Sequence, residues 1–196
     1  MQKLKTNDII FITLILVLDI VITGPILATL GMVLITLGLQ VGIATALISA
    51  ILYSILLRRV PVIGVLSAIS ITRGILAGFI MPPAFWPLFP VVALTGIIPD
   101  LVMYFFKLRP DNRITNKWMI TLNRVLTTPF MVPILMLTGL LELAQSSKLM
   151  EIKGITPLQV YLILAVFSMI VEGVLGYIGA VAGNRIADKL IKAGVK

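Results

Sequence analysis

Long apolar runs, separated by short polar or proline-rich stretches, fill almost the whole chain. The clearest run covers residues 160–183; Pro157 precedes it, and a basic segment that includes Lys192 follows it. A helix of this length crosses a hydrocarbon core, which needs roughly 20 residues at about 1.5 Å each. The pattern therefore predicts a membrane-spanning helix.

Earlier apolar runs predict five more helices. Gly31 and Gly38 favour a turn or a re-entrant loop between the first two helices. Four prolines among residues 82–90 end the third helix, and Pro129 and Pro133 predict a kink in the fifth. The predicted helices cover residues 9–23, 36–57, 62–80, 88–106, 115–141 and 157–183 of a single membrane domain, residues 1–196.

Composition supports this all-α, six-helix membrane bundle. Hydrophobic residues make up 59% of the 196 residues and charged residues only 12%, with a mean hydropathy of +1.12, which is far too apolar for a soluble domain. The chain has no cysteine and no histidine, which excludes disulfides, thiolate chemistry and imidazole acid–base catalysis. We expect no catalytic residue, no metal and no cofactor.

The basic residues predict the orientation of the bundle in the membrane. With six spans and both termini in the cytoplasm, the outer loops hold only Lys148 and Lys153. Cytoplasmic segments of membrane proteins carry an excess of Lys and Arg. The predicted location is a prokaryotic plasma membrane, with these basic residues on its inner side: Lys3, Lys5, Arg58, Arg59, Lys107, Arg109, Arg113, Lys117, Arg185, Lys189, Lys192 and Lys196.

Five charged residues fall inside predicted spans, where each is costly unless it is paired or faces a cavity. Their depths permit Arg73 to pair with Asp19, and Arg124 to pair with Asp100 or Glu172. Structural ion pairs are one interpretation of these residues, and proton coupling or direct substrate contact is the other.

Small residues recur at spacings of three and four on several helices. Such residues allow close helix approach in lipid, either within the bundle or against a partner protein. Gly173, Gly176, Gly179 and Gly183 form such a series on the last helix. The candidate partner-docking residues are Gly38, Gly42, Ala46 and Ala50 on the second helix and Gly74 and Gly78 on the third.

Aromatic and polar residues near the predicted outer ends of the spans are candidates for binding a small polar solute. Ring stacking would supply contact area there, and hydrogen bonds would supply orientation. An interfacial aromatic belt is the competing interpretation, especially for Trp86 and Tyr161. The candidate residues are Gln40, Phe85, Trp86, Phe89, Thr95, Glu142 and Tyr161.

Three features together resemble a known family: the Arg58-Arg59-Val60-Pro61 break, the Thr95-Gly96-Ile97-Ile98-Pro99-Asp100 segment, and the glycine-stepped last helix. This layout is similar to the substrate-binding S components of energy-coupling factor transporters, most of all to the branch linked to thiamine and hydroxymethylpyrimidine. The resemblance covers most of the chain. The alanine-spaced motif of the family's first helix has no counterpart among residues 9–23.

The resemblance implies capture of a small water-soluble vitamin or precursor from outside the cell. Partners would be a transmembrane scaffold subunit and two ATPases, since the chain has no phosphate loop of its own. The alternatives are a structural or assembly membrane protein without a ligand and an intramembrane lipid-modifying enzyme. The enzyme is disfavoured because the eight acidic residues are scattered singly, whereas such chemistry needs metal-binding carboxylate clusters.

Overall fold

The computed structural model describes residues 4–36, 42–80, 89–130 and 156–193. Within these ranges the regular structure is helical and contains no strand, as the sequence predicts. The first three helices are α1 (Thr6–Thr36), α2 (Gly42–Arg59) and α3 (Val65–Ile80). The others are α4 (Phe89–Phe105), α5 (Arg113–Val125) and α8 (Pro157–Lys192).

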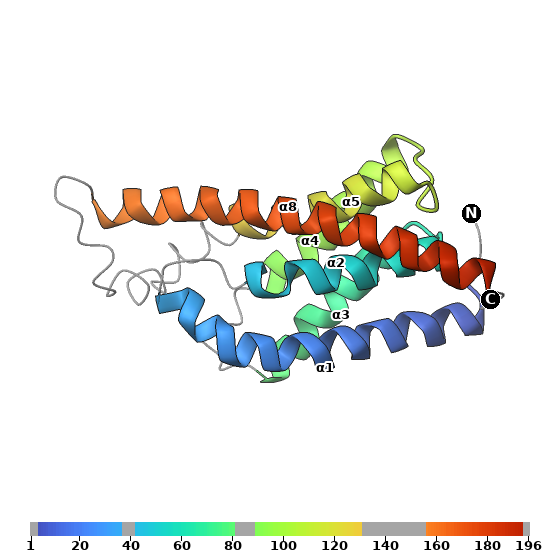
Figure 1. Cartoon of the computed structure of the whole chain (residues 1–196), viewed down its shortest axis with the longest axis horizontal. Coiled ribbons are helices and arrows are strands. Elements are labelled where there is room, and N and C mark those ends of the chain that lie inside the picture. The colour runs from blue at the N-terminus through green and yellow to red at the C-terminus, as the bar shows by residue number, and fades with distance from the viewer. Residues whose placement is uncertain (1–3, 37–41, 81–88, 131–155, 194–196) are drawn as a thin grey trace.

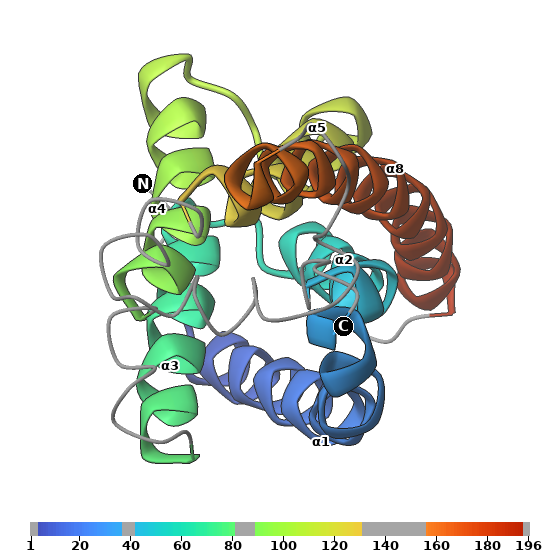
Figure 2. The same cartoon turned by 90° about the vertical axis from the view of Figure 1, so that its left-hand side faces the viewer.

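Helix α2 lies inside the bundle, and the other five helices follow one another around it (Figures 1 and 2). Toward its N-terminal half the inward positions are small or polar, and Ala46, Ser49, Ala50 and Ser54 are all fully buried; Leu56 and Leu57 are buried in its last turn. The start of α1 and the end of α8 lie at the same end of the bundle (Figure 1). We call it the charged end, because Lys5, Arg59 and Lys192 lie there.

The outer faces of the long helices are apolar. On α8, large side chains more than half exposed recur at helical spacing, among them Ile163, Phe167 and Ile170, whereas Ser168 and Glu172 point inward and are buried. Apolar side chains on the outside and polar side chains on the inside suit a protein surrounded by lipid hydrocarbon. In the part of the chain that the structure describes, three helices are long and apolar enough to span a bilayer, and α3 and α4 contain shorter apolar segments. The count of six spans stays a prediction.

Helix α1 is longer than the sequence predicts. We expected it to end at Thr23, with a turn or re-entrant loop before the second helix, but it continues through Gly24 and Pro25 to Thr36 and bends in its last third (Figure 1). In lipid, an interrupted helix would leave backbone groups without partners, so a bent helix is the cheaper solution. The Thr29 hydroxyl supports the bend by donating to the Pro25 carbonyl at 2.9 Å.

Helix α5 is interrupted where the sequence predicts a kink. It ends at Val125, a turn follows at Leu126, and helix resumes over residues 127–130. Pro129 explains the break, because its ring cannot pack against the carbonyl four residues earlier and it has no N–H to donate. The predicted end of this helix at residue 141 lies outside the described residues.

The small residues of α2 and α8 pack these two helices against each other. A Cβ added at Gly179 would lie 2.6 Å from the Leu47 carbonyl oxygen and 2.7 Å from the Ala50 Cβ, so only glycine permits this approach. Gly183 makes similar contacts with Ile51 and Ser54. Close packing of small residues is how helices associate in lipid.

These contacts bear on the predicted docking residues. Ala46 and Ala50 are fully buried, Gly74 is buried, and Gly42 is half-buried with the Glu172 carboxyl group beside it. The described positions therefore pack against neighbouring helices of the bundle, and their docking of a partner stays a prediction. Gly38 lies outside the described residues, as does the environment of Gly78.

A side chain of α5 repairs a defect in α4. Pro99 lies inside α4 and has no N–H, so the carbonyl of Thr95 loses its normal helical donor. The Asn123 side-chain amide donates to that carbonyl at 2.8 Å. The hydrogen bond joins α4 to α5 and fixes the turn of α5 that carries Arg124.

Polar contacts also join the helices at the charged end. Asp188 on α8 accepts from Arg58 on α2 at 2.5 Å and from Arg113 on α5 at 2.7 Å. One turn deeper, Asn116 exchanges hydrogen bonds with Ser54, at 2.6 Å and 3.1 Å. These contacts fix the relative positions of α2, α5 and α8.

Candidate functional site

Four of the five charged residues predicted inside spans lie in one buried polar region. Six helical segments contribute to it, namely α1, α2, α3, α5, residues 127–130 and α8. The hydroxyls of Ser49, Tyr53 and Thr128 complete it. Its members form two groups. The Asp19 group consists of Asp19, Ser49, Tyr53 and Arg73, and the Glu172 group consists of Arg124, Thr128 and Glu172.

In the Asp19 group the carboxylate has a full set of partners. Its Oδ1 accepts from Ser49 at 2.6 Å, and its Oδ2 accepts from the Tyr53 hydroxyl at 3.0 Å. Arg73 Nη1 lies 3.2 Å from the same Oδ2 and also donates to the Tyr53 hydroxyl at 3.3 Å. The structure therefore contains the Asp19–Arg73 ion pair that the depths permit, and it joins α1, α2 and α3.

In the Glu172 group the polar atoms are only partly satisfied. Thr128 donates to Glu172 Oε2 at 3.2 Å, and Arg124 lies over the Tyr53 ring, 4.8 Å from its centroid. Glu172 Oε1 and the Nε and Nη2 atoms of Arg124 are buried without a hydrogen-bond partner in the part of the chain that the structure describes. Buried polar atoms of this kind are rare and call for an explanation.

Neither predicted pairing of Arg124, with Asp100 or with Glu172, appears as an ion pair among the described residues. Asp100 is not its partner, because this carboxylate accepts from the backbone N–H and the hydroxyl of Ser67, at 2.7 Å and 2.6 Å, and so caps the first turn of α3. Glu172 lies in the same buried polar region as Arg124. The two side chains form no ion pair within 4.0 Å, since the described ion pairs involve other residues.

Most of the predicted solute-binding residues are not among the residues that the structure describes. Gln40, Phe85, Trp86 and Glu142 lie outside the described residues, and so do the side chains of Phe89 and Tyr161. Thr95 is described and buried, and its hydroxyl donates to the Val92 carbonyl at 2.7 Å. Its role in solute binding stays a prediction.

Sequence reasoning missed Tyr53, which lies between the two groups. Its hydroxyl contacts Asp19 and Arg73, while its ring lies under Arg124. The signal was present, because Ser49 and Tyr53 are four residues apart and therefore share one face of an apolar helix. Thr128 lies four residues after Arg124, and its hydroxyl donates to Glu172.

Two hollows lie at the charged end, away from this polar region. One, of about 310 Å³, lies between the α2–α3 loop near Val62 and the α4–α5 loop near Leu108. The other, of about 490 Å³, lies between the same α2–α3 loop and the first turn of α1 at Lys5. Neither is lined by a member of the Asp19 group or the Glu172 group. Among the described residues no cluster of three His, Cys, Asp or Glu side chains could hold a metal ion.

An apolar exterior, a buried ionic interior and helices of spanning length define an integral membrane protein of the helical-bundle class. Residues 6–192 match a family described as a hypothetical bacterial integral membrane protein (Trep_Strep). The match covers nearly the whole chain, and the protein belongs to this family. No curated protein and no solved structure matches the chain.

Proposed function

We propose that the protein is the substrate-capture subunit of an energy-coupling factor uptake transporter. It binds a small water-soluble vitamin or precursor from outside and passes it on with the help of a scaffold subunit and two ATPases. Membership of a bacterial integral membrane family and the likeness of the helix layout to S components support the proposal.

One observation carries it: the Glu172 group holds opposite charges that are buried and incompletely paired. Glu172 is 1% exposed and Arg124 is 8% exposed, yet each keeps at least one polar atom without a described partner. The Asp19 group is fully paired, and Asp100, which caps α3, leaves one buried oxygen without a described partner. The Glu172 group differs from both because unpaired donors and an unpaired acceptor of opposite charge lie in one place. Free donors and acceptors beside an aromatic ring suit a small polar solute.

The group lies toward the end of the bundle at which α2 begins. The Glu172 carboxyl group lies against Gly42, the first residue of α2, and Thr128 follows the break in α5. Both residues lie toward the end of the bundle opposite the charged end. Under the predicted orientation this is the outer half of the membrane.

The two groups also narrow the choice of ligand charge. Arg73 is engaged by Asp19, so Arg124 is the cation that remains for a carboxylate or another anionic group. Glu172 offers an acceptor to an amine or a ring N–H. A solute that carries both kinds of group would use both.

Thermal stabilisation of the detergent-purified protein against a panel of vitamins and precursors tests this function. One compound should raise the unfolding temperature strongly, because a ligand at 100 times its Kd adds about 2.7 kcal/mol. Trp86→Ala and Glu142→Gln should each weaken that response while folded yield stays near wild type. Equal responses in both variants would remove these two residues from the site.

Co-purification separates the transporter from its alternatives. When the affinity-tagged protein is purified from its native cells, a pair of ATPases and a second membrane subunit should co-purify with it. A structural protein would respond to no compound in the panel and would bring down no ATPase. That joint result would overturn the proposal.

A further inference from the structure

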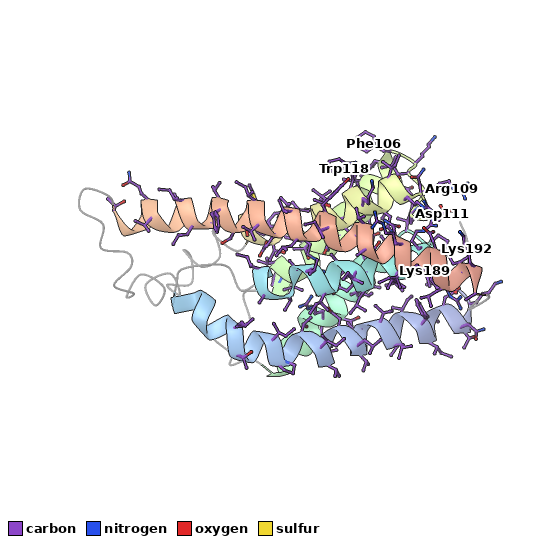
Figure 3. The ribbon with its side chains drawn as sticks, in the orientation of Figure 1. Phe106, Arg109, Asp111, Trp118, Lys189 and Lys192 are labelled. Atoms are coloured by element: carbon purple, nitrogen blue, oxygen red, sulfur yellow. The ribbon has the colours of Figure 1, made fainter. Side chains whose placement is uncertain are left out.

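The outer side of the α5–α8 contact, near the charged end, brings aromatic and basic side chains together. Trp118 is 57% exposed, and its ring centroid lies 6.0 Å from that of Tyr177. Lys117 Nζ lies 5.4 Å from the centroid of the Tyr177 ring. Trp118 and Phe106 project sideways from the bundle, and Arg109 and Lys192 lie farther toward its end (Figure 3).

This surface has the composition of a membrane interface. Trp and Tyr concentrate where hydrocarbon meets headgroups, because their rings are apolar and their N–H and O–H groups are polar. Around them the surface is apolar: Ile114 is 63% exposed and Ile178 is 51% exposed. In an integral membrane protein such a surface is covered by acyl chains.

Basic residues exceed acidic ones along the same contact. Lys117 has no carboxylate within ion-pair distance among the described residues. Arg113, four residues earlier on the same face of α5, remains 64% exposed although it contacts Asp188. Arg185, eight residues after Tyr177, is exposed and lies about 12 Å farther along α8.

The nearby acids do not neutralise this excess. Asp188 is shared by Arg58 and Arg113, and Asp111 is held by Arg109 at 2.9 Å. Lys117 lies one helical turn deeper than Arg113, about 6 Å toward the hydrocarbon. Its long side chain can lie on the ring while the ammonium group stays at phosphate level.

We propose that this surface, which consists of Ile114, Lys117, Trp118, Tyr177 and Arg185, binds one anionic phospholipid of the leaflet at the charged end. The lipid phosphate contacts Lys117, with Arg185 as a second cation. An acyl chain lies along Trp118 and Ile114. Anionic lipids are favoured because each basic residue near a membrane surface attracts them.

Trp118 provides the readout, since the chain has two tryptophans and Trp86→Phe leaves only this one. The Trp86→Phe protein is reconstituted in phosphatidylcholine vesicles that contain phosphatidylglycerol, with bromine on the acyl chains of either lipid. Bromine quenches the fluorescence of Trp118 on contact. We define the enrichment as the quenching by brominated phosphatidylglycerol divided by the quenching by brominated phosphatidylcholine at equal mole fraction, and we expect it to be about fivefold. Equal quenching by the two lipids would overturn the proposal.

Two charge-matched variants locate the site. Lys117→Gln should bring the enrichment down to near unity. Lys5→Gln, which removes the same charge just before α1 at the same end, should leave the enrichment unchanged. Enrichment retained in Lys117→Gln, or lost equally in both variants, would contradict a site at Lys117. Inorganic phosphate should not compete, and competition by it would show a free-anion site instead of a lipid site.

Discussion

The two groups in the bundle interior each combine a carboxyl group, an arginine and at least one hydroxyl group, yet they differ in how completely they are paired. Asp19 receives three contacts, from Ser49, Tyr53 and Arg73. Glu172, equally buried, receives one described hydrogen bond, from Thr128. Within the described residues, complete pairing in the Asp19 group joins α1, α2 and α3, whereas the incomplete pairing of the Glu172 group is the feature on which the proposed solute site rests.

The largest effect should come from breaking the Asp19–Arg73 pair. Arg73→Met leaves the Asp19 carboxylate buried without its cation, which should cost about 3–5 kcal/mol and lower the unfolding temperature by roughly 10 °C. Thermal unfolding in detergent measures this. Because the double variant with Asp19→Asn removes both charges, it should recover much of the loss. If the double variant were as unstable as Arg73→Met alone, the unpaired Asp19 carboxylate would not be the cause of the lost stability.

Glycine substitutions should show that the tight α2–α8 contact and the Glu172 group tolerate an added side-chain carbon differently. Gly179→Ala pushes a Cβ into the α2 backbone at Leu47 and should cost about 2 kcal/mol. At Gly42 the obstructing atoms all belong to the flexible Glu172 side chain, so Gly42→Ala should cost less than half as much.

The matched control for both is Gly24→Ala, where a Cβ meets nothing within 4 Å. Its stability should stay level or rise by up to about 1 kcal/mol, the gain in helix propensity. Thermal unfolding of the three variants side by side gives the order. If Gly42→Ala lost as much stability as Gly179→Ala, the Glu172 side chain could not move aside to make room for the added carbon.

Asn123 should have an intermediate effect, because it holds the turn of α5 that carries Arg124. Asn123→Leu leaves the Thr95 carbonyl without a donor and should cost about 1 kcal/mol. In a Pro99→Ala background the α4 backbone regains its own N–H, so the same substitution should cost much less. An unchanged cost in both backgrounds, measured as a double-mutant cycle, would contradict this repair.

The fold class and the buried charges follow from the sequence because their physical causes are local. An apolar run reports a membrane helix directly, and a charge within that run must turn inward, which is enough to predict the Asp19–Arg73 pair. The continuity of α1 through Pro25 was not predictable in this way, since proline breaks helices in water and only bends them in lipid.

Contacts between distant segments were also beyond local patterns. The glycine and alanine spacing of α2 indicates a close approach, but only the packed bundle shows that the neighbour is α8 and not another protein. Asp100 gives the same lesson: its depth permits Arg124 as partner, whereas the start of α3 at Ser67 is nearer. Roles at the outer end, including those of Trp86 and Glu142, remain predictions.

The smallest effect on stability should come from Glu172→Gln, and this substitution tests the comparison most directly. The amide keeps the shape of the side chain and can still accept from Thr128, so the change in unfolding free energy should stay below about 1 kcal/mol, the size of one hydrogen bond. Ligand binding should suffer instead. A tenfold loss of affinity reduces the stabilisation by a ligand at 100 times the wild-type Kd from about 2.7 to about 1.4 kcal/mol.

Asp19→Asn is the matched substitution in the Asp19 group, and it should lower stability with no selective loss of the ligand response. If Glu172→Gln destabilised the protein as much as Asp19→Asn and left the ligand response intact, the Glu172 group would be structural too, and the solute would bind elsewhere.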